Sequence, residues 1–340
     1  MMKLSRMLKV VATVDGNWRS SFAEQILMNW EHDEDSLYYI RASANFVFVF
    51  QNNGERYYLR FVEREEKNIE TIQAEIHILQ YLSSCSLQLN APVISKNQRY
   101  IEEIHTELGI FYAVVLKGLK GKHYAIEDLT KDQFYLWGKQ LGRLHAAFKT
   151  MPEELTKDRI TWREHLAYIE NSIPQEEFVL RKELERIEEW IHTLPITDEN
   201  FGFIHYDFEL DNLCIDGDII GIIDFDDCAH YWYIADIAYA LRDICNEKLE
   251  LNPLYFEAFL QGYRQETTID HAMLKDIQWF LRMHRLMMYA RLTRTVDIPD
   301  SEDYPLWIRD LRGKLFYYIE DIKQQVKNVT LYEGSTINNN

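Results

Sequence analysis

The chain has 340 residues, which exceeds the usual size of a single hydrophobic core and favours two domains or one domain of two lobes. With 47% hydrophobic and 27% charged residues, it has the composition of an ordinary globular protein and not of a disordered or fibrous one. The formal net charge of −18 argues against a general nucleic-acid binder, because such a protein needs a basic face to displace counterions.

The sequence also argues against a membrane partner. No uncharged stretch approaches the roughly 18 residues that a spanning helix needs. The N-terminal apolar run Leu8–Val14 contains Lys9 and Thr13 and lacks a small-residue cleavage site. The four cysteines form no CxxC pair and have no histidine at metal-ligand spacing, which favours free thiols in a reducing compartment. We therefore expect a cytoplasmic protein, and its oligomeric state stays open.

The first hundred or so residues are predicted to be mainly β-structure. A short amphipathic helix at 22–30 comes first, and three strands follow, with the turn signal Asn52-Asn53-Gly54 between the second and the third. A helix over Asn68–Ser83 has apolar residues at helical spacing, and two more strands come after it. The predicted strands cover Ser36–Ala42, Asn45–Gln51, Arg56–Val62, Tyr100–Ile104 and Gly109–Leu116.

The periodicity becomes helical after the Gly- and Lys-rich connector Lys117–Lys122. A capping-box pattern at Thr130 and Gln133 begins the first helix of this half, and an apolar stripe runs behind it from Phe134 to Phe148. Later helices are predicted at Glu177–Thr193, Asp236–Glu247, Pro253–Thr267, His271–Thr295 and Glu302–Lys327.

One β-island interrupts the helical half. The apolar run Phe201–Ile204 precedes two short strands, Leu213–Ile215 and Ile219–Ile223, which flank the strong hairpin signal Asp216-Gly217. The whole order predicts an α+β fold of two lobes. Residues 1–116 would form a small N-terminal lobe with an antiparallel sheet, and residues 117–340 a larger, mainly helical C-terminal lobe.

Two polar clusters lie at the ends of the hairpin, His205–Asn212 before it and Asp224–Asp227 after it. A phosphoryl-transfer site needs a carboxylate that accepts a hydrogen bond from the attacking hydroxyl, and hard oxygen ligands that hold Mg²⁺ against the nucleotide phosphates. Either cluster alone would most simply be a turn or a helix cap. The combination of HxDxxxxN, a tight hairpin and DFD favours phosphoryl transfer, because the hairpin can return Asp224 to Asn212.

The segment Phe203–Leu241 resembles the core of the aminoglycoside phosphotransferase and choline kinase family, whose members share the protein-kinase-like fold. The resemblance covers roughly residues 35–245. It implies an enzyme that uses ATP and Mg²⁺ to phosphorylate a hydroxyl group. It also implies that Asp207 is the catalytic base and that Asn212 and Asp224 are Mg²⁺ ligands.

The same resemblance gives supporting roles to four further residues. His205 is expected to brace the catalytic loop and not to act as an acid or base, and Asp236 to hold that loop through hydrogen bonds. His145 is expected to be buried structure. Whether Asp226 approaches the metal or the substrate stays open.

In the small lobe the resemblance implies a nucleotide site. Asn45 lies where the family has its nucleotide-covering loop, although the chain has no GxGxxG. Arg60 takes the place of the phosphate-binding lysine on the third strand, and Glu75 on the next helix is placed to pair with it. Leu116 to Gly118 would be the hinge that hydrogen-bonds adenine. The planar fork of an arginine can bind phosphate oxygens, but a strand arginine facing solvent is the alternative.

The sequence leaves the phosphate acceptor open, as it does the choice between ATP and GTP. The aromatic run Tyr231–Tyr233, together with Glu209, Asp211 and Asp227, would suit an amine-bearing alcohol, unless the aromatic residues simply fill the core. Four arginines at helical spacing suggest instead a carboxylate, or a solvated helix face. They are Arg282, Arg285, Arg291 and Arg294.

Three functions remain at this point. The first is a kinase for a hydroxyl of a small molecule such as an amino alcohol, an amino acid or an aminoglycoside-like compound. The second is a protein Ser/Thr kinase of the same fold, although only eleven residues separate Asp224 from Asp236 and leave little room for a regulated segment. The third is a non-catalytic nucleotide-binding protein.

Overall fold

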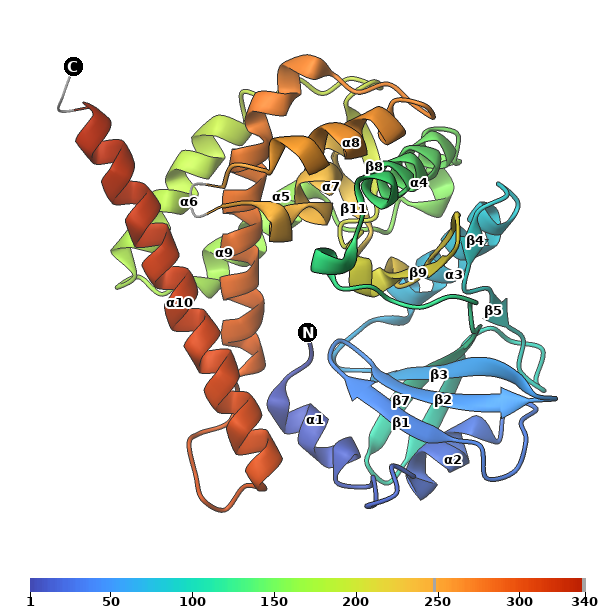
Figure 1. Ribbon diagram of the computed structural model, residues 1–340. Helices are drawn as coiled ribbons and strands as arrows, with labels where there is room; N and C mark the ends of the chain where they lie inside the picture. The colour runs from blue at the N-terminus through green and yellow to red at the C-terminus, as the bar shows by residue number, and fades with distance from the viewer. Residues whose placement is uncertain (247–248, 338–340) are drawn as a thin grey trace.

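The small lobe is built on an antiparallel sheet, and the computed structural model describes residues 1–246 and 249–337 of the chain. In this sheet β1, β2, β3 and β7 are neighbours in that order, and β5 and β6 both pair with the free edge of β7 (Figure 1). The sheet and the five predicted strands are thereby confirmed. The strands are β1 (Tyr38–Ala42), β2 (Phe46–Asn52), β3 (Glu55–Glu63), β5 (Pro92–Val93), β6 (Glu102–Thr106) and β7 (Gly109–Lys117).

Aromatic rings form the core beneath this sheet. Phe46, Phe48 and Phe50 on β2 are at most 1% exposed, while the residues between them on the strand are half-buried. Because side chains alternate along a strand, the three rings point to one face. Phe61 of β3 stacks on Phe46 and Phe48 with ring centroids 5.3 and 5.7 Å apart.

Three helices complete the small lobe. The predicted helix at 68–83 is α3 (Ile69–Ser83), and the side chain of Asn68 caps it by accepting a hydrogen bond from the Thr71 backbone N–H at 2.9 Å. The predicted amphipathic helix is α2 (Ser21–Leu27). A further helix, α1 (Leu4–Val11), precedes it and was not expected from the sequence.

The large lobe is mainly helical, as predicted, and its first helix begins at the reciprocal capping box of Thr130 and Gln133. Figure 1 shows the last helix beginning near α1 of the small lobe, which it contacts, and running from there along the side of the large lobe. The helices are α4 (Lys131–Lys149), α5 (Trp162–Ser172), α6 (Phe178–Ile191), α7 (Tyr233–Ala240), α8 (Pro253–Tyr263), α9 (Ile277–Thr295) and α10 (Leu306–Ile337).

Two of these helices, α4 and α8, pack unusually close to each other. A Cβ atom added at Gly138 of α4 would lie 1.9 Å from the carbonyl oxygen of Phe259, and one added at Gly262 of α8 would lie 1.9 Å from that of Tyr135. Only glycine tolerates such an approach of two backbones.

The predicted β-island lies within the large lobe. β9 and β10 form the antiparallel hairpin, and Gly217 in its turn has a φ of 60°, a left-handed conformation that favours glycine. β8 precedes the hairpin in the chain and β11 follows it, and the two strands pair with each other in antiparallel orientation. The strand β4, which directly follows α3, joins β10 in parallel. The bounds are β4 (Gln88–Leu89), β8 (Phe201–Ile204), β9 (Leu213–Asp216), β10 (Ile219–Ile222) and β11 (Ala229–Trp232).

Several predicted bounds were wrong. The helix expected at Asp236–Glu247 begins earlier, at Tyr233, and ends at Ala240, followed by a 3-10 turn; Glu247 lies outside the described residues. The first part of the helix expected at His271–Thr295 is also 3-10. Across residues 1–246 and 249–337, we find no helix with the length and apolar character required to cross a membrane.

Candidate active site

The loop between β8 and β9 carries Asp207 and Asn212 side by side. The Asn212 side-chain Nδ2 donates to the backbone oxygen of Asp207 at 2.9 Å and to its carboxylate Oδ2 at 3.0 Å. Tyr206, directly before Asp207, has a φ of 71°, a strained backbone conformation for a non-glycine residue. The loop is therefore bent and pinned so that the Asp207 carboxylate is presented in one orientation, with its side chain 31% exposed.

A buried carboxylate holds this loop from beneath. Asp236 Oδ2 and Oδ1 accept hydrogen bonds from the backbone N–H groups of His205 and Tyr206, both at 2.8 Å. Asp236 Oδ2 also lies 2.9 Å from His145 Nε2, and His145 Nδ1 lies 2.8 Å from the Tyr263 hydroxyl. The expected roles of Asp236 as a loop holder and of His145 as buried structure are confirmed. Burial lowers the pKa of His145 by more than the hydrogen bond and the negative charge of Asp236 raise it, so the ring stays neutral.

His205 links the catalytic loop to the far end of the hairpin. Its ring is fully buried, and its Nε2 lies 3.2 Å from the carbonyl oxygen of Ile223. Burial lowers the pKa of His205, so the neutral ring donates to that carbonyl. The expectation that His205 is a brace is confirmed.

The hairpin does return Asp224 to Asn212. The backbone N–H of Ile223 donates to the backbone oxygen of Asn212 at 3.0 Å, which places the next residue, Asp224, beside it. Asp224 has a φ of 65°. Burial and the neighbouring Asp226 carboxylate raise the pKa of Asp224 to about 7. The guanidinium groups of Arg60 and Arg41 near Asp224 offset these two effects only in part.

These residues fit a magnesium ion held between protein and phosphates. Within the described residues the Asn212 side-chain oxygen accepts no hydrogen bond, so it is available as a ligand together with the Asp224 carboxylate. Mg²⁺ commonly binds through one or two protein oxygens and takes its other ligands from water and substrate phosphates. No group of three His, Cys, Asp or Glu side chains suited to a metal occurs in the part of the chain that the structure describes.

Arg60 and Glu75 form the predicted pair. Arg60 Nη2 lies 2.5 Å from Glu75 Oε2, and both side chains are buried. Arg60 Nη1 also lies 3.8 Å from Asp224 Oδ1. The alternative that Arg60 faces solvent is therefore wrong, and its guanidinium lies beside the candidate metal ligand.

The loop between β1 and β2 reaches the second acidic cluster. Asn45 Nδ2 donates to Asp226 Oδ2 at 3.1 Å, and Lys67 forms an ion pair with the other oxygen of that carboxylate. Burial would raise the pKa of Asp226, but Lys67 and Arg60 outweigh it and hold that pKa far below its ordinary value. Asp226 therefore binds residues of the small lobe in this structure.

Two backbone N–H groups of the predicted hinge already donate hydrogen bonds within the protein. The N–H groups of Lys117 and Gly118 donate to the carbonyl oxygens of Ala91 and Arg56, each at 2.8 Å. Gly118 is required here, because a Cβ atom would lie 2.8 Å from the Arg56 oxygen. Leu116, in β7, is buried. A contact of Leu116 or Gly118 with adenine stays a prediction.

Sequence reasoning missed several arginines and lysines around the site. Arg159 is 4% exposed, and its guanidinium donates to the carbonyl oxygens of Cys228 at 3.1 Å, Phe225 at 3.3 Å and Asp226, as well as to Thr71 of α3 at 3.2 Å. It therefore clamps the turn after Asp224 to the small lobe. No local motif marks it.

Arg242 and Arg41 are two more cations that the sequence did not single out. Arg242 Nη1 lies 3.6 Å from Asp207 Oδ1, and its Nη2 pairs with Glu209. Arg41 Nη2 lies 3.4 Å from Asp224 Oδ2. Both lie next to carboxylates of the site but more than 30 residues away in sequence, so spacing could not reveal them.

The aromatic wall suggested for an acceptor is wrong. Tyr231 and Trp232 are fully buried and Tyr233 is 4% exposed, so the run fills the core. Of the three acidic residues proposed with it, Glu209 is paired with Arg242 and Asp227 with Arg291, whose Nη1 lies 2.8 Å from Asp227 Oδ2.

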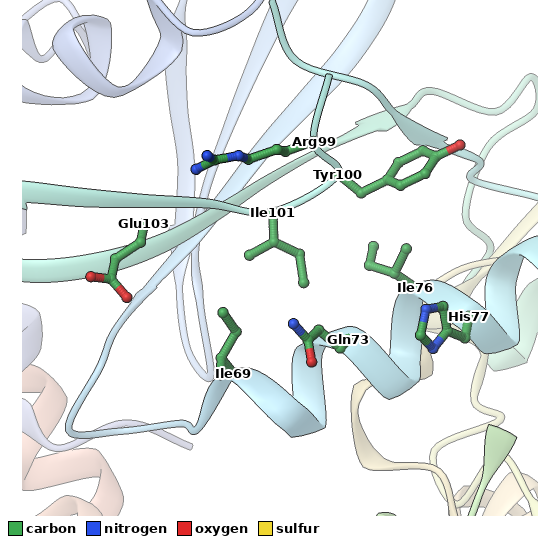
Figure 2. A pocket seen from close by; sticks show the side chains of 8 residues that line it. All are labelled: Ile69, Gln73, Ile76, His77, Arg99, Tyr100, Ile101 and Glu103. Carbon is green, nitrogen blue, oxygen red and sulfur yellow. The ribbon is translucent and has the colours of Figure 1, made fainter. Parts of the chain in front are cut away.

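Cavities show where an acceptor could enter. A cavity of about 1350 Å³ lies between α9, α10 and the segment after α7, and Arg242 lines it next to Asp207. A smaller groove of about 580 Å³ lies between α3 and residues 99–103, which lead into β6 (Figure 2). The larger cavity is the acceptor candidate because Arg242, which lines it, lies 3.6 Å from Asp207, whereas the smaller groove has no lining residue in contact with Asp207 in the described chain.

A family model described as "Phosphotransferase enzyme family" matches residues 40–272 of the chain. Among curated proteins, amicoumacin kinase of Bacillus subtilis (strain 168) is 22% identical over 275 residues, which span 78% of this chain and 82% of that protein.

Two solved structures share the fold. The first is an amicoumacin kinase in complex with AMP-PNP, Ca²⁺ and Ami, with a TM-score of 0.76 and 23% identity over 93% of this chain and 96% of that one. The second is a microcompartment-associated aminopropanol kinase, with a TM-score of 0.71 and 19% identity over 92% and 98% of the two chains. The kinase-like two-lobed fold is thereby confirmed.

Proposed function

The chain belongs to the phosphotransferase enzyme family, and we propose that it transfers the γ-phosphate of ATP, with Mg²⁺, to a hydroxyl group of a small molecule. The observation that supports this best is the joint placement of Asp207, Asn212 and Asp224. Hydrogen bonds at 2.9, 3.0 and 3.0 Å bring the base candidate and both metal-ligand candidates to one side of the hairpin.

In this reaction Asp207 acts as the base. Its carboxylate accepts the proton of the acceptor hydroxyl while the hydroxyl oxygen forms a bond to the γ-phosphorus. The bond from that phosphorus to the β,γ-bridging oxygen breaks, and ADP leaves. Asn212 keeps the carboxylate oriented, and the Arg242 guanidinium lies 3.6 Å from its Oδ1 atom.

A bound Mg²⁺ would neutralise charge on the nucleotide phosphates. Asn212 and Asp224 are the residues that would hold it, since Asn212 offers an amide oxygen that accepts no hydrogen bond within the described residues and Asp224 offers a carboxylate. Arg60, oriented by Glu75, would contact a phosphate directly.

We assign the remaining contacts on the same basis. Asn45 would cover the nucleotide from the β1–β2 loop, and Leu116 and Gly118 would face adenine. Residues 1–116 would then form the nucleotide-binding lobe and residues 117–340 the catalytic and substrate lobe. A cytoplasmic location fits an ATP-dependent reaction and four free cysteines. We expect neither a nucleic acid nor a membrane as partner.

Two variants test the assignment. Asp207→Ala should lower the rate of phosphoryl transfer by about 10²–10⁴-fold, because the proton acceptor is lost, while ATP binding with Mg²⁺ stays within threefold of the unmutated protein. Asp224→Ala should instead weaken Mg²⁺-dependent ATP binding. Titration calorimetry and a coupled ADP-release assay measure the two effects.

Asp218→Ala is the control, since Asp218 is exposed in the hairpin turn and should change neither quantity. If the unmutated protein binds no ATP in the presence of Mg²⁺, the kinase assignment fails. ADP release that only a dephosphorylated protein stimulates would favour a protein kinase in its place.

A further inference from the structure

The cavity of about 1350 Å³ in the large lobe contains charged groups of both signs. Arg242 lines it, and Arg242 Nη1 lies 3.6 Å from Asp207 Oδ1, so one guanidinium connects the cavity with the candidate base. Acidic side chains also line it, among them Asp243, Glu250 and Asp321. Apolar residues of α9 and α10 form much of the remaining wall.

Helix α9 carries the four arginines that the sequence singled out, and three of them have carboxylate partners. Arg282 binds both oxygens of Glu183, at 2.6 and 2.7 Å. Arg291 binds Asp227 at 2.8 Å, and Arg294 binds Glu66 at 2.7 Å. These three arginines therefore serve the fold and not a solvated helix face.

Arg285 differs from the other three. It lines the cavity, and within the described residues its guanidinium forms neither an ion pair nor a hydrogen bond. Burial lowers its pKa, and Cys245, Glu183 and Asp321 counteract this in part. Both oxygens of Glu183 already accept from Arg282, and Asp321 accepts from Gln325. A partly buried guanidinium without a partner is costly, because its five donors lose water and gain nothing.

We propose that Arg285 binds a carboxylate of the phosphate acceptor, so that the acceptor is a zwitterionic hydroxyl compound of the hydroxy-amino-acid type. A planar guanidinium binds a carboxylate through two parallel hydrogen bonds. The acidic lining residues disfavour a dianion such as a phosphate ester and suit an ammonium group on the same compound. This inference rests on the proposed phosphotransferase reaction and names the acceptor class for it.

Matched acceptors that differ only in the charge of interest provide the test. Each pair consists of an acid and the carboxamide in which an uncharged amide replaces the carboxylate. The acids are L-serine, L-threonine, L-homoserine and glycyl-L-threonine. In a coupled ADP-release assay, at least one acid should exceed its amide in kcat/KM by tenfold or more. Arg285→Met should bring that ratio close to one, and Arg285→Lys should restore part of it, since lysine keeps the charge but not the fork.

Arg294→Met is the matched control, because it removes a paired arginine from the same helix outside the cavity and should leave the acid-to-amide ratio unchanged. The inference is overturned if the unmutated protein prefers the amides, or if Arg285→Met keeps the preference for an acid.

A binding measurement separates this result from the proposed function. The acids are titrated calorimetrically into protein saturated with a non-hydrolysable ATP analogue and Mg²⁺, and binding of a preferred acid should weaken by tenfold or more in Arg285→Met. If no acid binds while the analogue does, the acceptor class is wrong and the phosphotransferase assignment stands. If the analogue itself fails to bind, the assignment of the reaction fails.

Discussion

Single residues far from any motif complete the site, and Arg159 is the clearest example. Its guanidinium joins three carbonyl oxygens of the turn after Asp224 to a carbonyl of α3. Arg159→Met keeps the length of the side chain but leaves these buried acceptors without a donor. We expect the free energy of unfolding to fall by about 2–4 kcal/mol.

Urea unfolding measures this loss, and Arg309→Met is its control, because Arg309 is exposed and its substitution should cost less than about 0.5 kcal/mol. We also expect weaker Mg²⁺-dependent nucleotide binding in Arg159→Met, since the Asp224 turn would no longer be clamped. Unchanged stability and unchanged binding would show that the carbonyls find other partners.

The candidate site was predictable from sequence where it is local. Asp207, Asn212 and Asp224 lie in two short motifs around a hairpin, and their spacing alone brings them together. Arg159 and Arg242 act through contacts with residues more than 30 positions away, which no short spacing encodes. The sequence also could not tell that Arg285 alone among the α9 arginines lines the cavity without an ion-pair partner in the described chain.

At the scale of elements, the contact between α4 and α8 depends on two glycines. Gly138→Ala and Gly262→Ala each place a methyl group 1.9 Å from a backbone oxygen of the facing helix. The helices would have to move apart, and we expect each substitution to cost about 1–3 kcal/mol or more. Thermal unfolding measures the effect.

Gly313 is the matched control for these substitutions. It lies exposed on α10, and a Cβ atom there would meet nothing within 4 Å. Gly313→Ala should therefore raise stability by about 0.5–1 kcal/mol through helix propensity alone. Equal effects at all three positions would contradict the close approach of α4 and α8.

Longer elements were predictable because they repeat their pattern. In the small lobe, the strands of five or more residues show a period of two residues, which sequence reasoning found. It also found the period of 3.6 residues in the helices α3, α4 and α6. β4 and β5 contain two residues each and cannot show any period. They exist because long-range pairing with β10 and β7 holds them.

At the scale of the whole molecule, buried neutral histidines predict its response to acid. His145, His165 and His205 are at most 4% exposed. Burial lowers the pKa of each ring, and it lowers that of His165 to about 3. The unfolded chain therefore takes up protons below its histidine pKa of about 6.5 that the folded chain does not.

The contribution of these three rings to stability should consequently be fully present above pH 6.5 and fall as the pH drops toward their lowered folded pKa values. Between pH 6.5 and 5.5 His165 contributes a loss of about 1 kcal/mol, whereas Asp224, whose pKa is raised to about 7, contributes a gain of similar size because its folded-state carboxyl takes up a proton there. Urea unfolding at the two pH values checks this in the unmutated protein and in His165→Phe, and the variant should lose about 1 kcal/mol less stability when the pH falls. Substitution of the exposed His123 by Gln should leave the change in stability between the two pH values as it is in the unmutated protein.

The strand β4 has a consequence for how the two lobes can be exchanged between relatives. Residues 88 and 89 precede the proposed boundary at 116, yet they pair in parallel with β10, whose chain continues directly into Asp224. The lobes are thus not separable modules: a chimera spliced at residue 116 would supply the catalytic hairpin with an edge strand from a foreign sequence. A working chimera has to carry a β4 matched to its own hairpin. The same connection ties α3, and with it Glu75, mechanically to the candidate metal site.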